Sequence, residues 1–552
     1  MNLINGREAD GFDTAVLVAG GGPVGLLLAH ELAWQGVDCV LVERNATGTA
    51  APKMDITNPR SMEHLRRLGL ADALRNVAVP RDHPMDIAWV TSMAGHELAR
   101  FSYPSVDEAR AIIRYVNDGT LALEPAMRVS QIVIEPELRR LLEQRDGIDT
   151  RFSTTLESFE QDDNGVDVVL RCDDGEQRRL RCRYLVGCDG GGSTVRRQLG
   201  IELEGTASVA ELYMIHFRSE ERAVLQRWGV AWHYQSQHGT LIAQDDDHTW
   251  TMHVAFPAGA DEADLDARAM LFEALGCKID CEILRANRWT PHLLVAENYR
   301  DRRVLLAGDA AHQYIPTGGY GMNTGVSEAA NLGWKLAAVL HGWGGACLLD
   351  SYQRERRPVA LRNRDASGQH MSVRLPIMEY CAKAAAFDGR DDDEARLARV
   401  SAGLAILELG NAENESLGLE MGYCYSDSPV VCHEDGPAPA FDALRYQPST
   451  RPGVRSPSAF LADGRALFDL IGKGFTLARF AYHDVSRIER AAAACGLPLT
   501  VLDLLDPGDD AVRCLYERDL VLIRPDQHVA WRGNSPPADP AALIDLVRGA
   551  SP

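Results

Sequence analysis

A glycine-rich turn near the N-terminus has the composition and spacing of a nucleotide-binding site. The turn reads Gly20-Gly21-Gly22-Pro23-Val24-Gly25, and Glu43 follows it further along the chain. In such a turn Gly20 permits the tight bend, Gly22 lets the backbone approach a pyrophosphate, and Gly25 lets helix and strand pack closely. Glu43 can accept hydrogen bonds from a ribose hydroxyl. The pattern therefore predicts a bound dinucleotide.

The elements expected to hold this turn are a strand, a helix and a second strand. Residues 14–19 form a short apolar run typical of a buried parallel strand, and residues 26–34 are rich in Ala and Leu, as expected of a helix. A second strand is predicted over residues 38–42, directly before Glu43. The N-terminus of the helix offers free N–H groups and a positive dipole end to the phosphates.

Two later segments repeat the pattern of a buried strand that runs into glycines. Residues 184–196 lead from a strand into Asp189-Gly190, and residues 304–323 lead from a strand into Gly308-Asp309 and a glycine-rich loop. A helix is predicted over residues 324–340. The loop over residues 318–323 should therefore present backbone N–H groups at the start of a helix.

With these three motifs the chain closely resembles the class A flavoprotein monooxygenases, the aromatic hydroxylases related to para-hydroxybenzoate hydroxylase and phenol hydroxylase. The resemblance also takes in Ser130-Gln131 and residues 331–336 and 352–358, and it spans most of residues 14–365. It implies an enzyme that binds FAD, consumes NADH or NADPH, and hydroxylates a small phenolic ring with O2 through a flavin C4a-hydroperoxide.

The resemblance also implies which residues contact the cofactor. Asp309 resembles the acid that binds the ribityl and phosphate region, Asp189 and Gly190 a motif for FAD and the nicotinamide nucleotide, and Gln131 a glutamine along the flavin. A positive helix end near the flavin pyrimidine edge would stabilise its negative charge. The expected FAD-binding set is Gly20, Gly22, Pro23, Gly25, Glu43, Arg44, Arg60, Gln131, Asp189, Gly190, Asp309, Gly319, Gly321, Met322 and Asn323.

Asp55 is the predicted catalytic base, because a phenol is a better nucleophile once it loses its proton. Residues 53–63 resemble the stretch of phenol hydroxylases in which an Asp that assists phenol activation precedes Arg-x-x-Glu, and Asp55, Arg60 and Glu63 match it. A turn-capping carboxylate is the alternative role for Asp55. Arg60 is expected to pack against the cofactor region or to pair with Glu63.

The other wall of the site is expected from a sheet. Residues 229–235, 239–244 and 249–256 alternate in the manner of antiparallel strands. Tyr234 and His253, with His233 beside them, are the candidates to reach a substrate hydroxyl; the alternative is that they are ordinary sheet residues.

Composition limits the partners. The formal charge of -22 opposes binding to nucleic acid and to anionic membranes, and no long apolar run predicts a membrane span. The cysteines form no Cys-x-x-Cys pair, and no metal-binding constellation is evident. We therefore expect reduced thiols, no metal, and a cytoplasmic enzyme whose partners are a small aromatic substrate and O2.

The predicted fold is α/β: a Rossmann-like FAD-binding domain interleaved with an antiparallel-sheet substrate domain, followed by a thioredoxin-like domain. The last domain resembles that of phenol-hydroxylase-type enzymes; without Cys-x-x-Cys it should serve packing or subunit contact, which leaves a homodimer or higher homo-oligomer open. The predicted boundaries are 1–200 and 296–365 for FAD binding (with 80–125 partly in the substrate domain), 201–295 for the substrate sheet, 366–435 for a helical segment, 436–453 for a linker, and 454–552 for the last domain.

Two other functions are compatible with the same motifs. A polyketide-tailoring oxygenase, acting by hydroxylation or Baeyer–Villiger oxidation, would need FAD but no phenol-activating base. A non-catalytic FAD-binding redox module would use the C-terminal domain, although no cofactor motif is broken. The ring substituents and the choice of NADH or NADPH stay open, since Arg44 beside Glu43 is not decisive.

Overall fold

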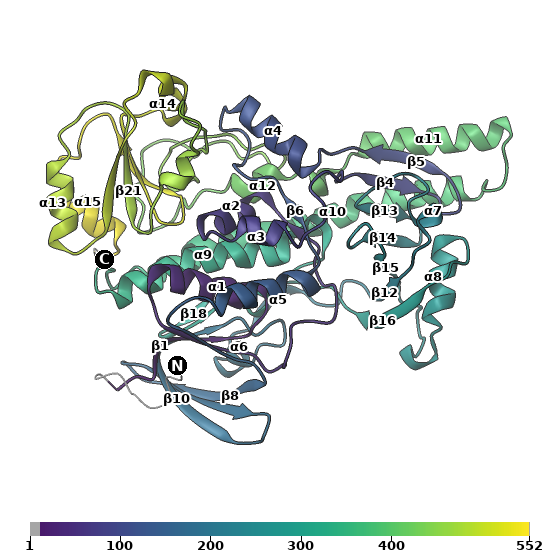
Figure 1. The fold of residues 1–552 in the computed structure, drawn as a ribbon, viewed down its shortest axis with the longest axis horizontal. Helices are drawn as coiled ribbons and strands as arrows, with labels where there is room; N and C mark the ends of the chain where they lie inside the picture. The colour runs from purple at the N-terminus through teal and green to yellow at the C-terminus, as the bar shows by residue number, and fades with distance from the viewer. Residues whose placement is uncertain (1–10, 551–552) are drawn as a thin grey trace.

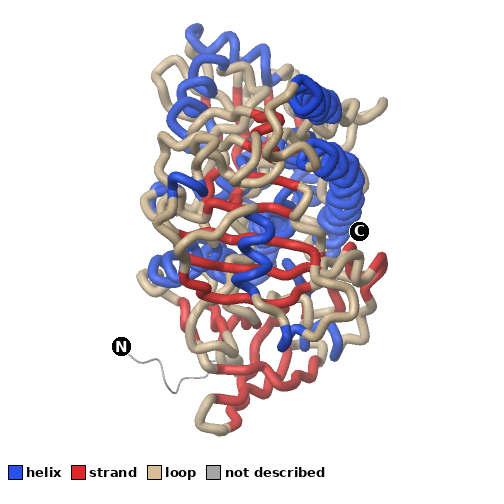
Figure 2. Tube along the Cα trace, turned by 90° about the vertical axis from the view of Figure 1, so that its right-hand side faces the viewer, coloured by secondary structure: helices blue, strands red, loops and turns tan. Residues whose placement is uncertain are grey.

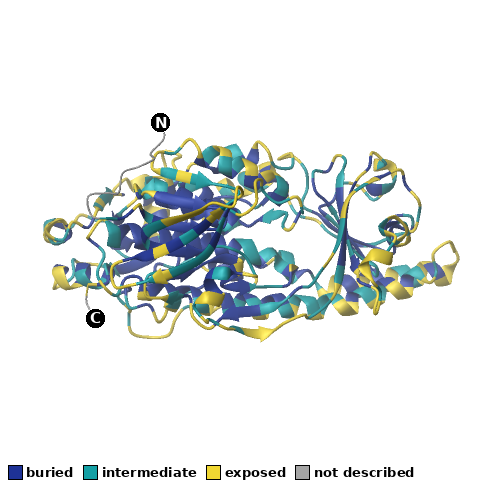
Figure 3. Cartoon of the chain, turned by 90° about the horizontal axis from the view of Figure 1, so that it is seen from below, coloured by how far each residue is buried: buried dark blue, intermediate teal, exposed yellow. Residues whose placement is uncertain are grey.

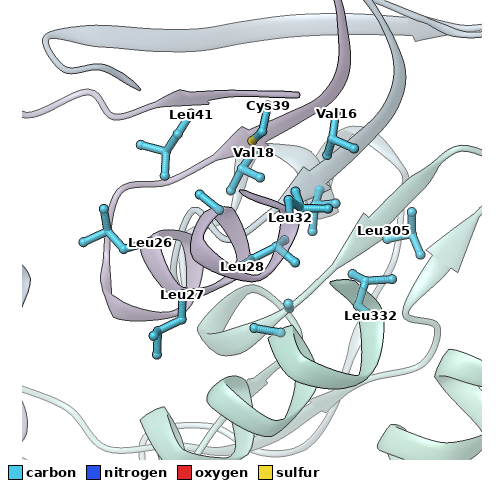
Figure 4. Packing of buried hydrophobic residues seen from close by; sticks show 14 of the residues in the cluster. Val16, Val18, Leu26, Leu27, Leu28, Leu32, Cys39, Leu41, Leu305 and Leu332 are labelled. Carbon is cyan, nitrogen blue, oxygen red and sulfur yellow. The ribbon is translucent and has the colours of Figure 1, made fainter. Parts of the chain in front are cut away.

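The largest sheet carries the glycine motifs. The computed structural model describes residues 11–550, and in it an eight-stranded sheet has parallel strands at its centre, covered by α1, α5 and α9 (Figure 1). The apolar runs read from the sequence pack here: side chains of β1, α1, β19 and α9 meet in one cluster (Figure 4). The strands in order are β18 (Arg300–Asp301), β19 (Val304–Leu306), β10 (Gln177–Gly187), β1 (Thr14–Ala19), β2 (Cys39–Val42) and β7 (Ile148–Arg151), with β8 (Thr154–Gln161) and β9 (Val166–Cys172) beside β10; the helices are α1 (Pro23–Gln35), α5 (Gln131–Leu142) and α9 (Tyr320–Leu340).

The second sheet has seven strands and forms the other end of the molecule, where Figure 2 shows strands across the middle and long helices at one side. One face packs on α8 and the other on α10 and α11, because its strands alternate between two sets of side chains. The strands in order are β16 (Glu282–Trp289), β12 (Leu212–Arg218), β15 (Thr249–Ala255), β14 (Gly239–Ala243), β13 (His233–Ser236), β4 (Ile87–Val90) and β5 (Glu97–Phe101); the helices are α7 (Arg222–Leu225), α8 (Ala267–Leu275), α10 (Asp350–Ala385) and α11 (Asp393–Leu409).

The C-terminal part is a four-stranded sheet with helices around it. The strand order is β22-β21-β23-β24: β21 runs parallel to β22 and antiparallel to β23, and β23 and β24 form a hairpin. The elements are β21 (Phe475–Arg479), α13 (Ser486–Ala494), β22 (Leu499–Asp503), α14 (Asp510–Tyr516), β23 (Leu520–Ile523), β24 (Val529–Gly533) and α15 (Pro540–Val547).

Short elements connect the three parts. They include β3 (Ile56–Thr57), α2 (Pro59–Arg67), α3 (Ala71–Arg75), α4 (Val106–Val116), β6 (Met127–Arg128), α6 (Thr194–Gln198), β11 (Leu203–Thr206), β17 (Leu293–Ala296), β20 (His312–Gln313) and α12 (Leu417–Met421). Buried residues run continuously through the centre, with exposed ones along the outside (Figure 3). The predicted α/β class, with parallel and antiparallel sheets, is confirmed.

Several boundaries differ from the sequence prediction: α1 begins at Pro23 rather than residue 26, and β13 begins at His233 rather than residue 229. The helix expected from residue 324 begins at Tyr320, because Gly319 takes the left-handed conformation before it (φ 64°) and Asn323 bonds back to the Gly319 carbonyl at 2.7 Å. The last part of the predicted glycine loop is thus the first helical turn. Within residues 11–550 no helix is both long and apolar enough to cross a membrane.

Candidate active site

All three glycine motifs lie at one edge of the large sheet. The strands β1, β10 and β19 are parallel neighbours, with Ala19 level with Gly187 and Gly187 level with Leu306. Each motif follows the carboxyl end of its strand. Ligands of open α/β sheets bind outside this edge, where loops from neighbouring strands diverge. The structure therefore brings together segments that are distant in sequence.

The first glycine turn has the geometry that a pyrophosphate needs. Gly20 has φ +112°, and a Cβ there would lie 2.2 Å from the Cys188 carbonyl oxygen; a Cβ on Gly25 would lie 2.0 Å from the Gly20 oxygen. Gly22 caps α1, and among the described residues the one atom near a Cβ built on it is Glu135 Oε1, 4.0 Å away; Pro23 begins the helix at a position that needs no N–H. The turn leaves a helix N-terminus free to receive phosphate oxygens.

Glu43 stabilises this turn from the end of β2. Its carboxylate accepts hydrogen bonds from the Gly21 N–H at 2.7 Å, and from the backbone and side-chain nitrogens of Asn45 at 2.9 and 2.6 Å. Arg44 beside it is exposed. Both carboxylate oxygens are thus engaged with the turn and with Asn45, which gives Glu43 a structural role at the glycine turn.

The second motif places Asp189 in a capping position. Its carboxylate accepts from the Ser193 hydroxyl at 2.5 Å and from the Thr194 and Val195 N–H groups at 2.7 and 3.2 Å, which fixes the start of α6. Gly190 has φ +82° and no atom within 4 Å of a Cβ built on it. A ligand can therefore approach the backbone at Gly190, and Asp189 has a structural task whether or not it also contacts the cofactor.

The third motif places an acid beside the start of α9. The Asp309 side chain is exposed, yet desolvation by the surrounding protein raises its pKa, against the opposing charges of His312 and Lys53. A Cβ on Gly321 would meet no atom within 4 Å, and Met322 beside it is half-buried. The first turn of α9 is thus open to a ligand. His312 is fully buried, 3.2 Å from Glu328 and stacked on Tyr314, as expected of a packing residue.

Gln131 lies at the start of α5, but its side chain turns toward its own helix. Its amide donates to Glu135 at 2.6 Å, and Glu135 also accepts from the Thr49 N–H at 2.6 Å. Burial raises the pKa of Glu135, and Glu43 adds to the effect. Glu135 Oε1 lies 4.0 Å from a Cβ built on Gly22, so Glu135 lies beside the glycine turn, and the sequence analysis did not identify it.

Arg60 is not brought to the glycine turn. Its buried guanidinium pairs with Glu63 at 2.8 Å, as the i, i+3 spacing predicted, and also donates to Gln527 at 2.6 Å and to the Asp526 carbonyl at 2.8 Å. The reason is the orientation of α2, whose Arg60 face is turned toward the C-terminal hairpin. Arg60 therefore joins two parts of the chain rather than lying open to a cofactor.

Asp55 lies between the large sheet and the second sheet. Its Oδ2 accepts from the Trp232 indole N–H at 2.6 Å and lies 3.4 Å from His233 Nε2, and the side chain is 17% exposed. Burial alone would raise its pKa, but the hydrogen bonds from His233 and Trp232 and the charge of Arg128 outweigh it and lower the pKa. Among the described residues none donates to Oδ1. Asp55 is thus an ionised acceptor with one oxygen open.

The segment that carries Asp55 is fixed to the start of α9. Asn323 accepts from the Asn58 N–H at 3.0 Å and donates to the Ile56 carbonyl at 3.2 Å. A Cβ on Gly319 would lie 2.5 Å from Ile56, so glycine is needed for this close approach. The helix end expected at the flavin and the predicted base are therefore positioned by the same side chain.

Tyr234 and His253, the two strand residues predicted to reach a substrate hydroxyl, have different positions. Tyr234 is 2% exposed in the core that faces α8, and its hydroxyl donates to the Gly229 carbonyl at 2.5 Å, so it lies on the face of β13 opposite His233. His253 lies near Asp55 and His233; burial is the main cause that lowers its pKa to about 4, so it is neutral at pH 7. The structure brings His233 and His253, but not Tyr234, toward Asp55.

Several residues around Asp55 had no clear sequence signal. Trp232 precedes His233 in a strand whose register to Asp55 cannot be read locally, and α10, predicted only as a helical segment, covers this sheet face. α10 brings Arg374 to this face, where Arg374 and Gln235 of β13 both donate to Glu413. Among the described residues, no group of three or more His, Cys, Asp or Glu side chains is arranged to hold a metal ion.

Comparisons with known proteins agree with this geometry. The model of an FAD binding domain matches residues 13–367, and that of an aromatic-ring hydroxylase C-terminal domain matches residues 449–549. The chain is 37% identical to the FAD-dependent monooxygenase apdD of Emericella nidulans, over 94% of this chain and 87% of that protein. It is 30% identical to a phenol 2-monooxygenase of a Pseudomonas species, over 98% and 94%.

Among solved structures, the rebeccamycin biosynthetic enzyme RebC with reduced flavin superposes with a TM-score of 0.86 at 34% identity, covering 98% of this chain and 99% of that one. The free N-terminus of α1 and the open space at Gly190 and Gly321 fit FAD. This chain belongs to the FAD-dependent aromatic-ring hydroxylases, monooxygenases that use NADH or NADPH as co-substrate.

Proposed function

We propose that this enzyme hydroxylates a phenolic ring and that Asp55 accepts the proton of the substrate hydroxyl. The observation that supports this most directly is the Asp55 carboxylate, held through Oδ2 by Trp232 and His233 while Oδ1 stays open. Bound FAD, reduced by NAD(P)H, would supply the oxygen-transfer chemistry. The phenolic substrate class is also compatible with the name of the phenol 2-monooxygenase relative.

The chain's own residues contribute binding, orientation and proton transfer. The Trp232 indole keeps the Asp55 carboxylate in place, because its N–H can only donate. A hydroxyl that reaches Oδ1 would donate a hydrogen bond to Asp55, which can take up the proton as the ring reacts, and His233, 3.4 Å from Oδ2, is placed to pass it on. A deprotonated ring is more electron-rich and so reacts better with an electrophilic oxygen.

We further propose that the cofactor is held by the glycine turn with Glu43 and Arg44, by Asp189 and Gly190, by Asp309, and by the first turn of α9 with Gly319, Gly321, Met322 and Asn323. Gln131 would join them only if its amide turned away from Glu135. The C-terminal part, which we propose to be a thioredoxin-like unit, contacts α2 through buried ion pairs rather than through the cofactor edge.

The test is NAD(P)H oxidation by the FAD-loaded enzyme, screened over simple phenols, resorcinols, salicylates and fused phenolics. One ring class should stimulate consumption, with oxygen incorporated into the product. Asp55→Asn should retain FAD and lower hydroxylation by about 10²–10⁴-fold. Hydroxylation that survives in Asp55→Asn would exclude Asp55 as the base.

A polyketide-tailoring oxygenase is the second candidate, and the 31% identity to a putative polyketide hydroxylase of Streptomyces halstedii favours it. On that function the substrate would be a fused polycycle. Stimulation by polycyclic substrates alone, with Asp55→Asn still active, would support this candidate over the first.

A further inference from the structure

Beyond Asp55, a row of polar side chains crosses the sheet face that α10 covers. Gln235 of β13 is level with Thr240 of β14, and Thr240 is level with His253 of β15. Arg374 of α10 lies over the row and donates to the Thr240 hydroxyl at 3.3 Å. Elsewhere along the same helix, α10 packs on the sheet through apolar side chains. The polar row is therefore an interruption of an otherwise apolar interface.

An ion pair covers the row. Arg374 donates to Glu413 at 2.7 Å, with side chains 20% and 10% exposed, and Gln235 donates to the same carboxylate at 3.4 Å. Burial alone would raise the pKa of Glu413, but the charge and hydrogen bond of Arg374 outweigh it and lower the pKa. The pair is therefore charged on both sides and neutral in sum, and neutral His253 adds no charge.

Four buried polar atoms of this cluster have no hydrogen-bond partner among the described residues. They come from different elements: Gln235 Oε1, Arg374 Nε, Glu413 Oε2 and His253 Nδ1. Gln235 is only 1% exposed. Buried polar atoms nearly always have a hydrogen-bond partner in native proteins, because an unpaired one lowers the stability of the folded state. Their convergence at one place indicates a missing partner.

The cluster adjoins the predicted base. His233, which contacts Asp55, lies two residues before Gln235 on the same face of β13, about 7 Å along the strand. A ring whose hydroxyl reaches Asp55 can therefore extend toward the cluster. His253 is close enough to Asp55, His233 and Arg374 for their charges to act on it.

We propose that Gln235, Arg374, Glu413 and His253 form a second recognition site, which binds an uncharged hydroxyl group on the side of the aromatic substrate away from Asp55. The proposal rests on the proposed function of Asp55. A hydroxyl can donate to Gln235 or Glu413 and accept from Arg374, whereas a carboxylate cannot donate to these oxygens and gains no net charge from the neutral Arg374–Glu413 pair. The favoured substrates are thus aromatics with at least two hydroxyl groups.

The test measures binding, not turnover. Dissociation constants for phenol against resorcinol, and for 1-naphthol against dihydroxynaphthalenes, are obtained from perturbation of the flavin absorption of the FAD-loaded enzyme. The wild type should bind at least one dihydroxy compound roughly tenfold more tightly than its monohydroxy partner. Gln235→Leu should reduce that preference roughly five- to tenfold, while monohydroxy binding stays within about twofold.

Controls separate this proposal from a structural role. Gln235→Glu preserves size and provides a second variant if Gln235→Leu does not fold. Thr476→Val removes another buried unpaired hydroxyl, in the C-terminal sheet, and should leave the preference unchanged. Equal binding of every pair by the wild type, or equal weakening of both members by Gln235→Leu, overturns the second site and assigns the cluster to bound water.

The Asp55 variant distinguishes the two proposals. Asp55→Asn should lose hydroxylation yet keep the binding preference for two hydroxyl groups. If Asp55→Asn still hydroxylates while Gln235→Leu loses the preference, the assignment of Asp55 as the base is wrong and the proposal of a second recognition site is retained. If Asp55→Asn is inactive and Gln235→Leu keeps the preference, the proposal of a second recognition site is wrong and the assignment of Asp55 as the base is retained.

Discussion

Glu63 is the buried carboxylate that joins α2 to the C-terminal part of the chain. It accepts from Arg60 and from Arg455 Nε at 2.8 Å each, makes a further short contact with Arg455 Nη2, and accepts from the Leu123 N–H at 2.8 Å. The three charged side chains are at most 1% exposed. Burial alone would raise the pKa of Glu63, but Arg455 and Arg60 outweigh it and lower the pKa.

Glu63→Gln keeps the volume but leaves two buried guanidinium groups without a carboxylate. Removing one partner of a buried ion pair costs about 3–5 kcal/mol of unfolding free energy. The matched control lies on the same helix: Arg66 pairs with Asp469 at 2.6 Å, with side chains 31% and 43% exposed. Asp469→Asn should cost at most about 1 kcal/mol, because exposed pairs contribute little.

Urea unfolding of the FAD-loaded enzyme, followed by tryptophan fluorescence, measures the loss of unfolding free energy in Glu63→Gln and in Asp469→Asn. The folded pKa of Glu63 lies below its unfolded value, so its stabilisation is present above the ordinary carboxyl pKa of about 4.3 and is lost as pH falls through the folded pKa. The difference between wild type and Glu63→Gln should therefore shrink in acid. A loss in Glu63→Gln no larger than that in Asp469→Asn would refute the buried-pair argument.

Three further predictions follow from named contacts. Gly25→Ala places a Cβ 2.0 Å from the Gly20 oxygen and should abolish FAD retention, measured as the flavin-to-protein absorbance ratio; full retention would contradict the close approach. Tyr234→Phe should cost about 1 kcal/mol of stability with hydroxylation unchanged, and a large fall in kcat would show that Tyr234 acts in the site after all. Burial lowers the pKa of His30 and His528 to about 4, so the unfolded state binds more protons between pH 6.5 and 4, and unfolding free energy should fall by about 2 kcal/mol for each between pH 7 and 5. Histidine-to-glutamine variants at these positions should flatten that pH dependence in denaturant titrations; an unchanged slope would mean that other groups cause it.

The edge of the large sheet that carries the three glycine motifs was predictable, because each motif is specified by residues close together in the sequence. The strand over Thr14–Ala19 has the predicted bounds, and the Gly20, Gly22 and Gly25 spacing specifies a turn that only glycine can form. Parallel strands then place the later motifs at the same edge, since their carboxyl ends share one side of the sheet. The start of α9 was misplaced because glycines within its first turn resemble a loop.

The surroundings of the predicted base could not be read from the sequence. Asp55 contacts Trp232 and His233, which are 177 and 178 residues away in the sequence, and Arg60 contacts Gln527, which is 467 residues away. Alternation within β13 limits His233 and Tyr234 to opposite faces but does not say which face lies toward Asp55. Residue types and local spacing by themselves determined the family, the cofactor edge and the position of the candidate base; only the packing of distant elements decided which side chains surround it, because strand register and helix orientation depend on long-range burial.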